Sequence, residues 1–143
     1  MKRLLTTVAL CLIAASAFAQ AKSLRVINTT GCTVYYRVLA NNTACPLGTF
    51  GTTIIAFPPG DVTYPSSSAL GLPPELILNA AYAYPNPGCL SAVYQVGDPC
   101  TGLPLGPLGM YSAFSGCNVC RQHYIEWIPA AAPGGQARLL FYL

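Results

Sequence analysis

The chain ends in two segments of alternating apolar and polar residues, and these decide the fold class. The first is Arg121-Gln122-His123-Tyr124-Ile125-Glu126-Trp127-Ile128, and the second is Gln136-Ala137-Arg138-Leu139-Leu140-Phe141-Tyr142-Leu143. Alternation with a period of two is typical of a strand with one buried face. The connecting residues 129–135 are Pro, Ala and Gly, a composition that favours a turn. The two segments are therefore predicted to pair as a β-hairpin.

Short strands are predicted along the rest of the chain as well. The predicted ranges are 24–28, 32–39, 52–57, 61–64, 75–84, 90–96 and 110–114. β-branched and aromatic residues support them, and turns containing Pro or Gly separate them. Residues 75–84 would also accept a helix, because Pro-Pro-Glu is a suitable helix start, but the alternation of Leu78, Ala80 and Tyr82 favours a strand.

About eight or nine short strands without a clear helix predict an all-β fold. Closely spaced turns are typical of an antiparallel β-sandwich, either immunoglobulin-like or jelly-roll-like, and disulfides are expected to stabilise it. Thirteen prolines and thirteen glycines fit a chain with many turns. No internal repeat or linker divides the chain, so residues 20–143 are predicted to form a single domain.

Residues 1–19 have the pattern of a secretory signal peptide. Two basic residues precede an apolar segment at residues 4–15, and Ala17-Phe18-Ala19 is a small-x-small cleavage sequence. A membrane anchor is the competing interpretation, but the apolar segment is short for crossing a bilayer and leads into the cleavage sequence. We therefore expect cleavage before Gln20, no transmembrane anchor afterwards, and a secreted, extracellular location. In a bacterium this location would be the periplasm or the outer surface.

Charge is sparse in the predicted mature chain. Without the two basic residues of the signal peptide, five of the seven Lys and Arg residues remain against four Asp and Glu residues, which gives a net charge of +1. Charged residues make up 8% of the sequence, compared with roughly 25% in typical soluble domains. The lack of a basic cluster argues against a nucleic-acid partner. So little charge protects poorly against association, which favours as partner a protein or glycan at a cell surface, or further copies of the chain.

Six cysteines remain after the predicted signal peptide, and an even number in an exported chain favours disulfides. The simplest arrangement joins neighbours in sequence. Its pairs are Cys32–Cys45, Cys89–Cys100 and Cys117–Cys120. An alternative joins Cys100 to Cys117 or to Cys120, and the sequence does not decide between these arrangements.

Cys117 and Cys120, together with His123, form the sharpest local motif. Two thiols and an imidazole could bind zinc, and a Cys-x-x-Cys pair can catalyse redox exchange. The flanking residues predict strands rather than the helix of a redox protein, and exported cysteines are expected to oxidise. A small secreted hydrolase or metal-dependent enzyme centred on His123 is the alternative function. The sequence contains no Gly-x-Ser-x-Gly motif and no carboxylate pair expected to face one another, so nothing supports this alternative. We therefore predict that the protein is not an enzyme and needs no metal or cofactor.

Tyrosines and a leucine-containing loop are the predicted binding elements. A tyrosine ring offers a sugar or peptide a flat apolar face and a polar tip, although tyrosines also fill sandwich cores. Residues 99–109 form a predicted loop whose leucines would cover a core edge or form a contact patch. The candidate binding residues are Tyr35, Tyr82, Tyr84, Tyr124, Leu103, Leu105 and Leu108. The predicted function is a secreted, non-enzymatic binding or assembly module that acts through low-charge, tyrosine-rich faces and this loop.

Overall fold

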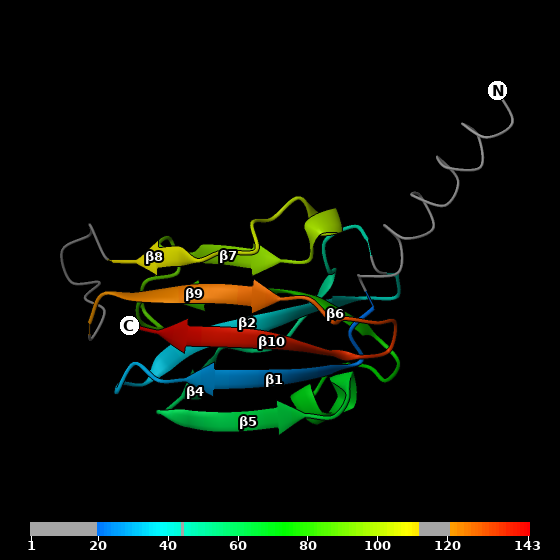
Figure 1. Ribbon diagram of the computed structural model, residues 1–143, viewed down its shortest axis with the longest axis horizontal. Coiled ribbons are helices and arrows are strands. Elements are labelled where there is room, and N and C mark those ends of the chain that lie inside the picture. Colours follow the sequence, from blue (N-terminus) through cyan, green and yellow to red (C-terminus); the bar gives the residue numbers. More distant parts are fainter. Residues whose placement is uncertain (1–19, 44, 112–120) are drawn as a thin grey trace, which may run out of the picture.

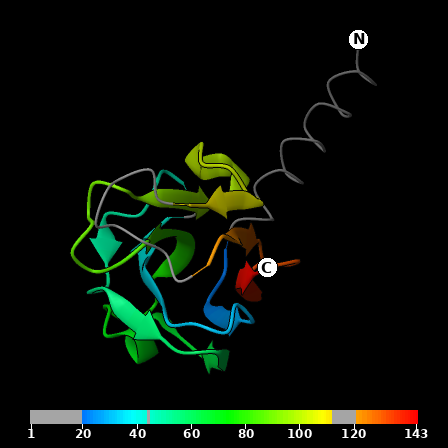
Figure 2. The same ribbon diagram turned by 90° about the vertical axis from the view of Figure 1, so that its left-hand side faces the viewer.

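The computed structural model describes residues 20–43, 45–111 and 121–143, and in these ranges the chain is all-β (Figure 1). Two sheets, each rich in antiparallel pairs, pack face to face in a sandwich-like arrangement. Seen end-on, the strands surround one core (Figure 2). The predicted signal peptide lies outside the described residues.

Ten short strands form the two sheets of the described chain. The first sheet has the order β5 (Gly60–Tyr64), β1 (Ser23–Asn28), β10 (Gln136–Tyr142), β9 (His123–Ile128) and β8 (Leu108–Met110), and we call it the β10 sheet. The second has the order β3 (Phe50–Gly51), β2 (Val34–Asn41), β6 (Ile77–Tyr84) and β7 (Tyr94–Gly97), with β4 (Ile55–Phe57) also paired to β2, and we call it the β2 sheet. The described residues also contain two 3₁₀ turns, η1 (Ser67–Leu70) and η2 (Pro99–Thr101). Over the described ranges, no helix has the length and apolar content needed to cross a membrane.

The predicted hairpin of β9 and β10 is confirmed. The two strands pair antiparallel over five opposed positions. Along β9, His123, Ile125 and Trp127 are buried, whereas Tyr124 is exposed, as the alternation indicates. In the connecting turn Gly134 has a φ of 74°, a left-handed conformation that glycine adopts without steric cost.

β10 also pairs with β1, and this pair is parallel. Its register runs from Ser23 opposite Gln136 to Asn28 opposite Phe141. The predicted all-antiparallel arrangement is therefore wrong at this pair, while the other strand pairs of the described chain are antiparallel. Parallel neighbours need a long connection, and here most of the chain lies between the two strands. Alternation along a strand indicates its buried face but not the direction of its neighbour.

Several predicted ranges differ from the observed strands. The range 52–57 contains only β4, at its end, and β3 lies just before it. The range 90–96 shortens to β7, because turns at Cys89 and Ala92 occupy its beginning and leave Leu90 58% exposed. Residues 108 and 109, the end of the predicted loop, join Met110 in β8, since pairing with β9 outweighs the local Gly and Pro content. The predicted strand 110–114 extends beyond the described residues after Tyr111.

The core lies between the sheets, and its largest fully buried side chains are aromatic. These are Trp127, Tyr36 and Phe141. The Tyr36 ring lies 5.8 Å from the Phe141 ring and meets Phe57 edge-on at 6.4 Å between ring centroids. Such tilted and edge-on pairs add to the free energy gained by burial. The Tyr36 hydroxyl lies 3.2 Å from that of Tyr64, so the buried phenol has a hydrogen-bond partner.

A disulfide joins Cys45 to Cys100, with 55 residues of sequence separation and a Cα–Cα distance of 5.7 Å. The predicted pairs Cys32–Cys45 and Cys89–Cys100 are therefore wrong, and so is the alternative that joins Cys100 to Cys117 or Cys120. Both Cys32 and Cys89 are disulfide-bonded as well. The predicted pair Cys117–Cys120 lies outside the described residues. Asn79 of β6 connects the two segments that carry these cysteines. Its Nδ2 donates to the carbonyl of Pro46, which follows Cys45, and its backbone carbonyl accepts from the N–H of Asp98, two residues before Cys100.

The buried side chain of Asn28, at the end of β1, connects three segments through hydrogen bonds. Its Nδ2 donates to the carbonyls of Cys32 at 2.7 Å and Phe57 at 3.0 Å. Its Oδ1 accepts from the backbone N–H of Thr30 at 3.1 Å and from the Thr30 hydroxyl at 2.7 Å. The amide is therefore fully used, and it links β1 to β4 and to the turn before β2.

Candidate binding site

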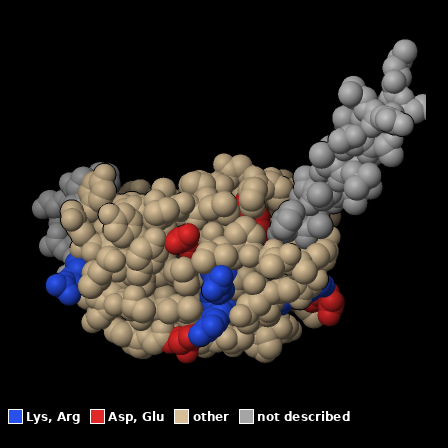
Figure 3. Space-filling view, viewed as in Figure 1, with Lys and Arg blue, Asp and Glu red and all other residues tan. Residues whose placement is uncertain are grey.

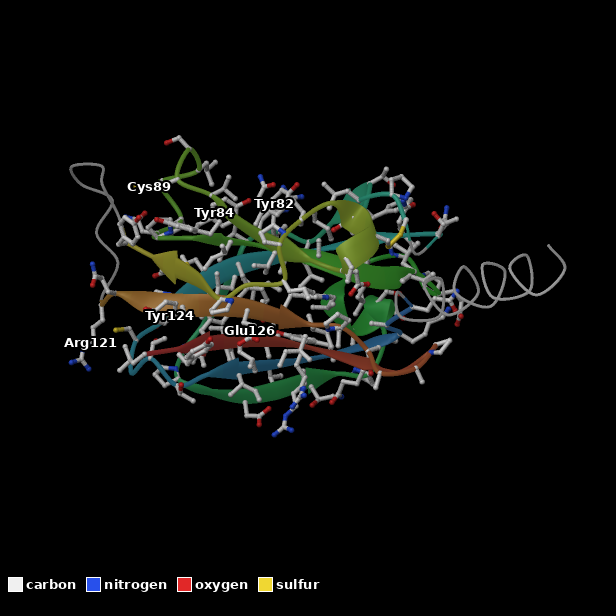
Figure 4. All side chains as sticks on the ribbon, turned by 45° about the horizontal axis from the view of Figure 1, so that its top comes forward. Tyr82, Tyr84, Cys89, Arg121, Tyr124 and Glu126 are labelled. Carbon is white, nitrogen blue, oxygen red and sulfur yellow. A yellow bond between two sulfur atoms is a disulfide. The ribbon has the colours of Figure 1, made fainter. Side chains whose placement is uncertain are left out.

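The predicted tyrosines separate onto two outer faces of the sandwich. Tyr35, Tyr82 and Tyr84 belong to adjacent strands of the β2 sheet, where Tyr35 lies opposite Tyr84 in the register. Tyr124 lies on the outer face of the β10 sheet. Figure 4 shows this division, with Tyr82 and Tyr84 on β6 and with Tyr124 and Glu126 on β9. Tyr84 is buried, and Tyr35 and Tyr82 are half-buried, so Tyr124 is the most exposed of the four.

A hollow of about 340 Å³ opens beside Tyr124 where β8 pairs with β9. Its lining residues are Gly109, Met110, Tyr111, Gln122, His123 and Tyr124, and we call it the tyrosine hollow. Tyr111 and Tyr124 are 59% and 45% exposed. A Cβ added at Gly109 would lie 3.6 Å from the Tyr124 ring and 3.9 Å from the Tyr111 ring. The two rings thus flank the bare glycine backbone, which forms the floor of the hollow.

Tyr142 extends this aromatic surface along the sheet. Its ring stacks on the Tyr124 ring, with 5.7 Å between centroids and 29° between planes. Its hydroxyl donates a hydrogen bond to Oε2 of Glu126 at 3.1 Å. Loss of hydration on partial burial, followed by this hydrogen bond and by the charge of Glu126, raises the pKa of Tyr142. The phenol therefore keeps its proton at neutral pH, and the bond holds the ring beside Tyr124.

Tyr111 is held in place by a residue of the opposite sheet. The hydroxyl of Tyr94 in β7 accepts a hydrogen bond from the Tyr111 backbone N–H at 3.2 Å and donates one to the Tyr111 carbonyl. Tyr94 itself packs against the core. One wall of the tyrosine hollow is therefore anchored to the interior of the sandwich, which limits the entropy lost when a ligand binds there.

His123 points toward the core, with its ring 6.2 Å from that of Phe141. Its Nδ1 lies 2.8 Å from the Arg121 carbonyl, and because a carbonyl only accepts, the hydrogen of the neutral ring is on Nδ1. Nε2 is shielded from solvent and has no hydrogen-bond partner in the described chain. Within these same ranges, no three His, Cys, Asp or Glu side chains are grouped closely enough to hold a metal ion. Cys117 and Cys120, the other parts of the predicted motif, lie outside the described residues.

Asp98 forms a buried polar pair that sequence reasoning missed. The carboxylate accepts a hydrogen bond from Nε1 of Trp127 at 2.7 Å. Burial raises the pKa of Asp98 from 3.8 to about 6, although the hydrogen bond from Trp127 acts in the opposite direction. The available signal was the single Trp on a predicted core face, because a buried indole N–H needs an acceptor.

The predicted loop 99–109 mainly closes the space between the two sheets. The Leu105 carbonyl accepts from the Trp127 backbone N–H at 2.7 Å, and the Pro104 carbonyl accepts from that of Gly97 at 3.0 Å. Leu108 packs against the core and Leu103 is half-buried. Leu105 is 39% exposed, so of the three predicted leucines it is the one that offers a surface to a partner.

The outer face of the β10 sheet carries charges of both signs, and uncharged surface surrounds them on the side that faces the viewer in Figure 3. The charged residues of its strands are Arg25, Asp61, Glu126 and Arg138. Arg25 and Asp61 form an ion pair on this sheet, away from the tyrosine hollow. Comparison with protein families, characterised proteins and solved structures finds no match for this chain.

Proposed function

We propose that the protein is an exported, non-enzymatic binding module whose tyrosine hollow binds a neutral sugar of a cell-surface or extracellular glycan. The observation behind this proposal is the pair of exposed rings, Tyr111 and Tyr124, which flank the backbone of Gly109. A sugar ring has apolar C–H faces and a rim of hydroxyls. Exposed tyrosine rings can cover the faces, and phenol groups can bond the rim.

The polar groups around the rings favour a neutral ligand. Gln122 lines the hollow and is exposed, and its amide can both donate to and accept from a hydroxyl. Glu126 is engaged by the Tyr142 hydroxyl, so its charge helps to fix the aromatic surface. A volume of about 340 Å³ falls at the lower end of the range of roughly 300–1,000 Å³ for ligand pockets, which suits a short stretch of glycan.

Export rests on the signal-peptide pattern of residues 1–19, and a single domain of residues 20–143 is part of the same proposal. An immunoglobulin-like or jelly-roll-like sandwich is the architecture we propose for that domain. The low charge of the surface and the exposed Leu105 would suit assembly with a protein partner or with further copies of the chain.

A screen of immobilised neutral and acidic glycans, followed by calorimetric titration with the best neutral trisaccharide, tests the proposal. Tyr124→Ala should weaken binding about tenfold, because removal of one stacked ring costs on the order of 1–2 kcal/mol. Tyr124→Phe keeps the ring and should stay within a fewfold of the unmodified protein. Tyr82→Ala on the opposite sheet is the matched control and should leave affinity unchanged. An equal loss for Tyr82→Ala and Tyr124→Ala, or no glycan bound at all, would refute the proposal.

A further inference from the structure

A second hollow, of about 720 Å³, lies at the outer side of the β2 sheet. Its lining residues are Arg37, Gly51, Thr52, Thr53, Ile54, Tyr84 and Leu90, and we call it the Arg37 hollow. They come from β2, from β3 and the segment that follows it, from β6, and from the turn after β6. The tyrosine hollow belongs to the other sheet, so the two sites are separate.

The guanidinium of Arg37 lies against the backbone of Gly51 in this hollow. A Cβ added at Gly51 would overlap Nη2 of Arg37, so the glycine leaves the space through which the guanidinium passes. On the neighbouring strand, Tyr82 lies opposite Arg37 in the register. Arg37 itself is half-buried, and its Nε is shielded from solvent without a hydrogen-bond partner in the described chain.

The chain supplies no carboxylate side chain to balance this charge. It has four acidic residues, all of them in the described ranges, and each is engaged elsewhere. The contacts are Asp61 with Arg25, Glu75 with Lys22 at 2.9 Å, Asp98 with Trp127 at 2.7 Å and Glu126 with Tyr142 at 3.1 Å. A half-buried guanidinium that lacks an anionic partner is costly, and an external anion would remove that cost.

We propose that the Arg37 hollow binds the carboxylate of a small organic acid with a ring-sized body. The planar guanidinium can hold the two oxygens of a carboxylate in parallel hydrogen bonds. The exposed Thr53 offers a hydroxyl beside it, and Tyr84, Ile54 and Leu90 form walls for the body of the ligand. The carboxylate is the shared recognition element, and the body is either a sugar acid or an apolar ring.

Calorimetric titration with four probes tests this proposal. Glucuronate and phenylacetate carry the carboxylate on a sugar ring and on an apolar ring, and methyl glucuronate ester and phenylacetamide are their neutral counterparts. At least one acid should bind about tenfold or more tightly than its neutral counterpart, since charge-assisted pairs are the stronger ones. Binding of glucuronate alone identifies a sugar acid, and binding of phenylacetate alone identifies an apolar acid. Equal affinity for acids and neutral counterparts, or no binding of any probe, overturns the proposal.

Two variants and one control assign the binding to this hollow. Arg37→Gln removes the charge, and Gly51→Ala keeps the charge but displaces the guanidinium. Each should weaken acid binding about tenfold or more, whereas Arg138→Gln, an exposed residue of β10, removes the same charge elsewhere and should have no effect. The Nε–Hε NMR signal of Arg37 in the unmodified protein gives a readout that does not depend on variant folding, and it should shift on addition of the acid. An unshifted signal, or equal losses in all three variants, contradicts the proposal without bearing on the tyrosine hollow.

Discussion

The buried pair of Asp98 and Trp127 leads to a quantitative prediction about stability and pH. Burial raises the pKa of Asp98 from 3.8 to about 6 in the folded chain, whereas the unfolded chain has the ordinary value. A carboxyl that holds its proton more tightly when folded stabilises the fold at low pH. This contribution is fully present below pH 3.8 and is lost as the pH rises through about 6. A difference of about two pKa units corresponds to about 3 kcal/mol.

Replacement of Asp98 by Asn removes this titration and leaves an amide oxygen that can accept the Trp127 bond. The free energy of unfolding of Asp98→Asn, relative to the unmodified protein, should therefore rise by about 3 kcal/mol between about pH 3.5 and pH 8. Urea unfolding at a series of pH values measures this difference, and titrations common to both proteins cancel. Because Trp127 is the single Trp of the chain, its fluorescence should also change near pH 6 in the unmodified protein and not in the variant.

Asp61→Asn provides the matched control. Hydrogen bonds from Arg25, and then its charge, lower the pKa of Asp61, so this carboxylate stabilises the fold above its usual pKa and the contribution is lost as the pH falls. The stability difference for Asp61→Asn should therefore have the opposite sign to that for Asp98→Asn. A stability difference for Asp98→Asn that stays flat from pH 3.5 to pH 8 would refute the reasoning, because it would mean that burial does not perturb this carboxyl.

Three further predictions concern stability and the role of His123. Asn28→Ala should lower the free energy of unfolding by about 2–3 kcal/mol in urea titrations, because buried partners on three segments lose their bonds; a loss below about 0.5 kcal/mol would contradict this. Joint replacement of Cys45 and Cys100 by Ser should cost about 4 kcal/mol by the loop-entropy estimate for 55 residues, and an unchanged urea midpoint would argue against that bond. His123 lines the tyrosine hollow, but its ring faces Phe141 in the core and its Nε2 is buried, so His123→Gln should keep trisaccharide affinity within about twofold in calorimetry, and a larger loss would give His123 a direct role.

Local patterns in the sequence predicted well those strands that have one face buried in the core and the other exposed to solvent. β9 and β10 follow directly from alternation, and so does the exposed position of Tyr124 between the buried His123 and Ile125. In β6 the predicted common face of Leu78, Ala80 and Tyr82 does not hold, because Leu78 lies in the core with Ala81 and the register shifts beside it. Non-local features could not be read in this way. The parallel contact of β1 with β10 and the Cys45–Cys100 bond both join residues far apart in sequence, and a periodic pattern contains no information on which distant strand becomes a neighbour.

The candidate sites depended on the same kind of long-range placement. Tyr124 was named from the sequence as a candidate binding residue, but Tyr111 becomes its neighbour only because β8, which begins within the predicted loop, pairs with β9. Arg37 showed one local signal, a charged residue within an otherwise apolar and aromatic strand. Arg37 becomes a candidate anion-binding residue only in the folded chain, where Gly51 lies against the guanidinium and all four carboxylates have other partners.

The parallel pairing of β1 with β10 gives the domain a direction along which it should resist mechanical tension. β1 begins at one end of the sheet, close to residue 20, and β10 finishes at the other end, next to Leu143 (Figure 1). A pull applied between residue 20 and Leu143 would slide these two strands past each other and load their shared hydrogen bonds together, across six opposed positions. Bonds loaded together in shear yield at higher force than bonds that open one after another. A module attached at one end and holding a ligand near the other would therefore transmit tension through its own sheet.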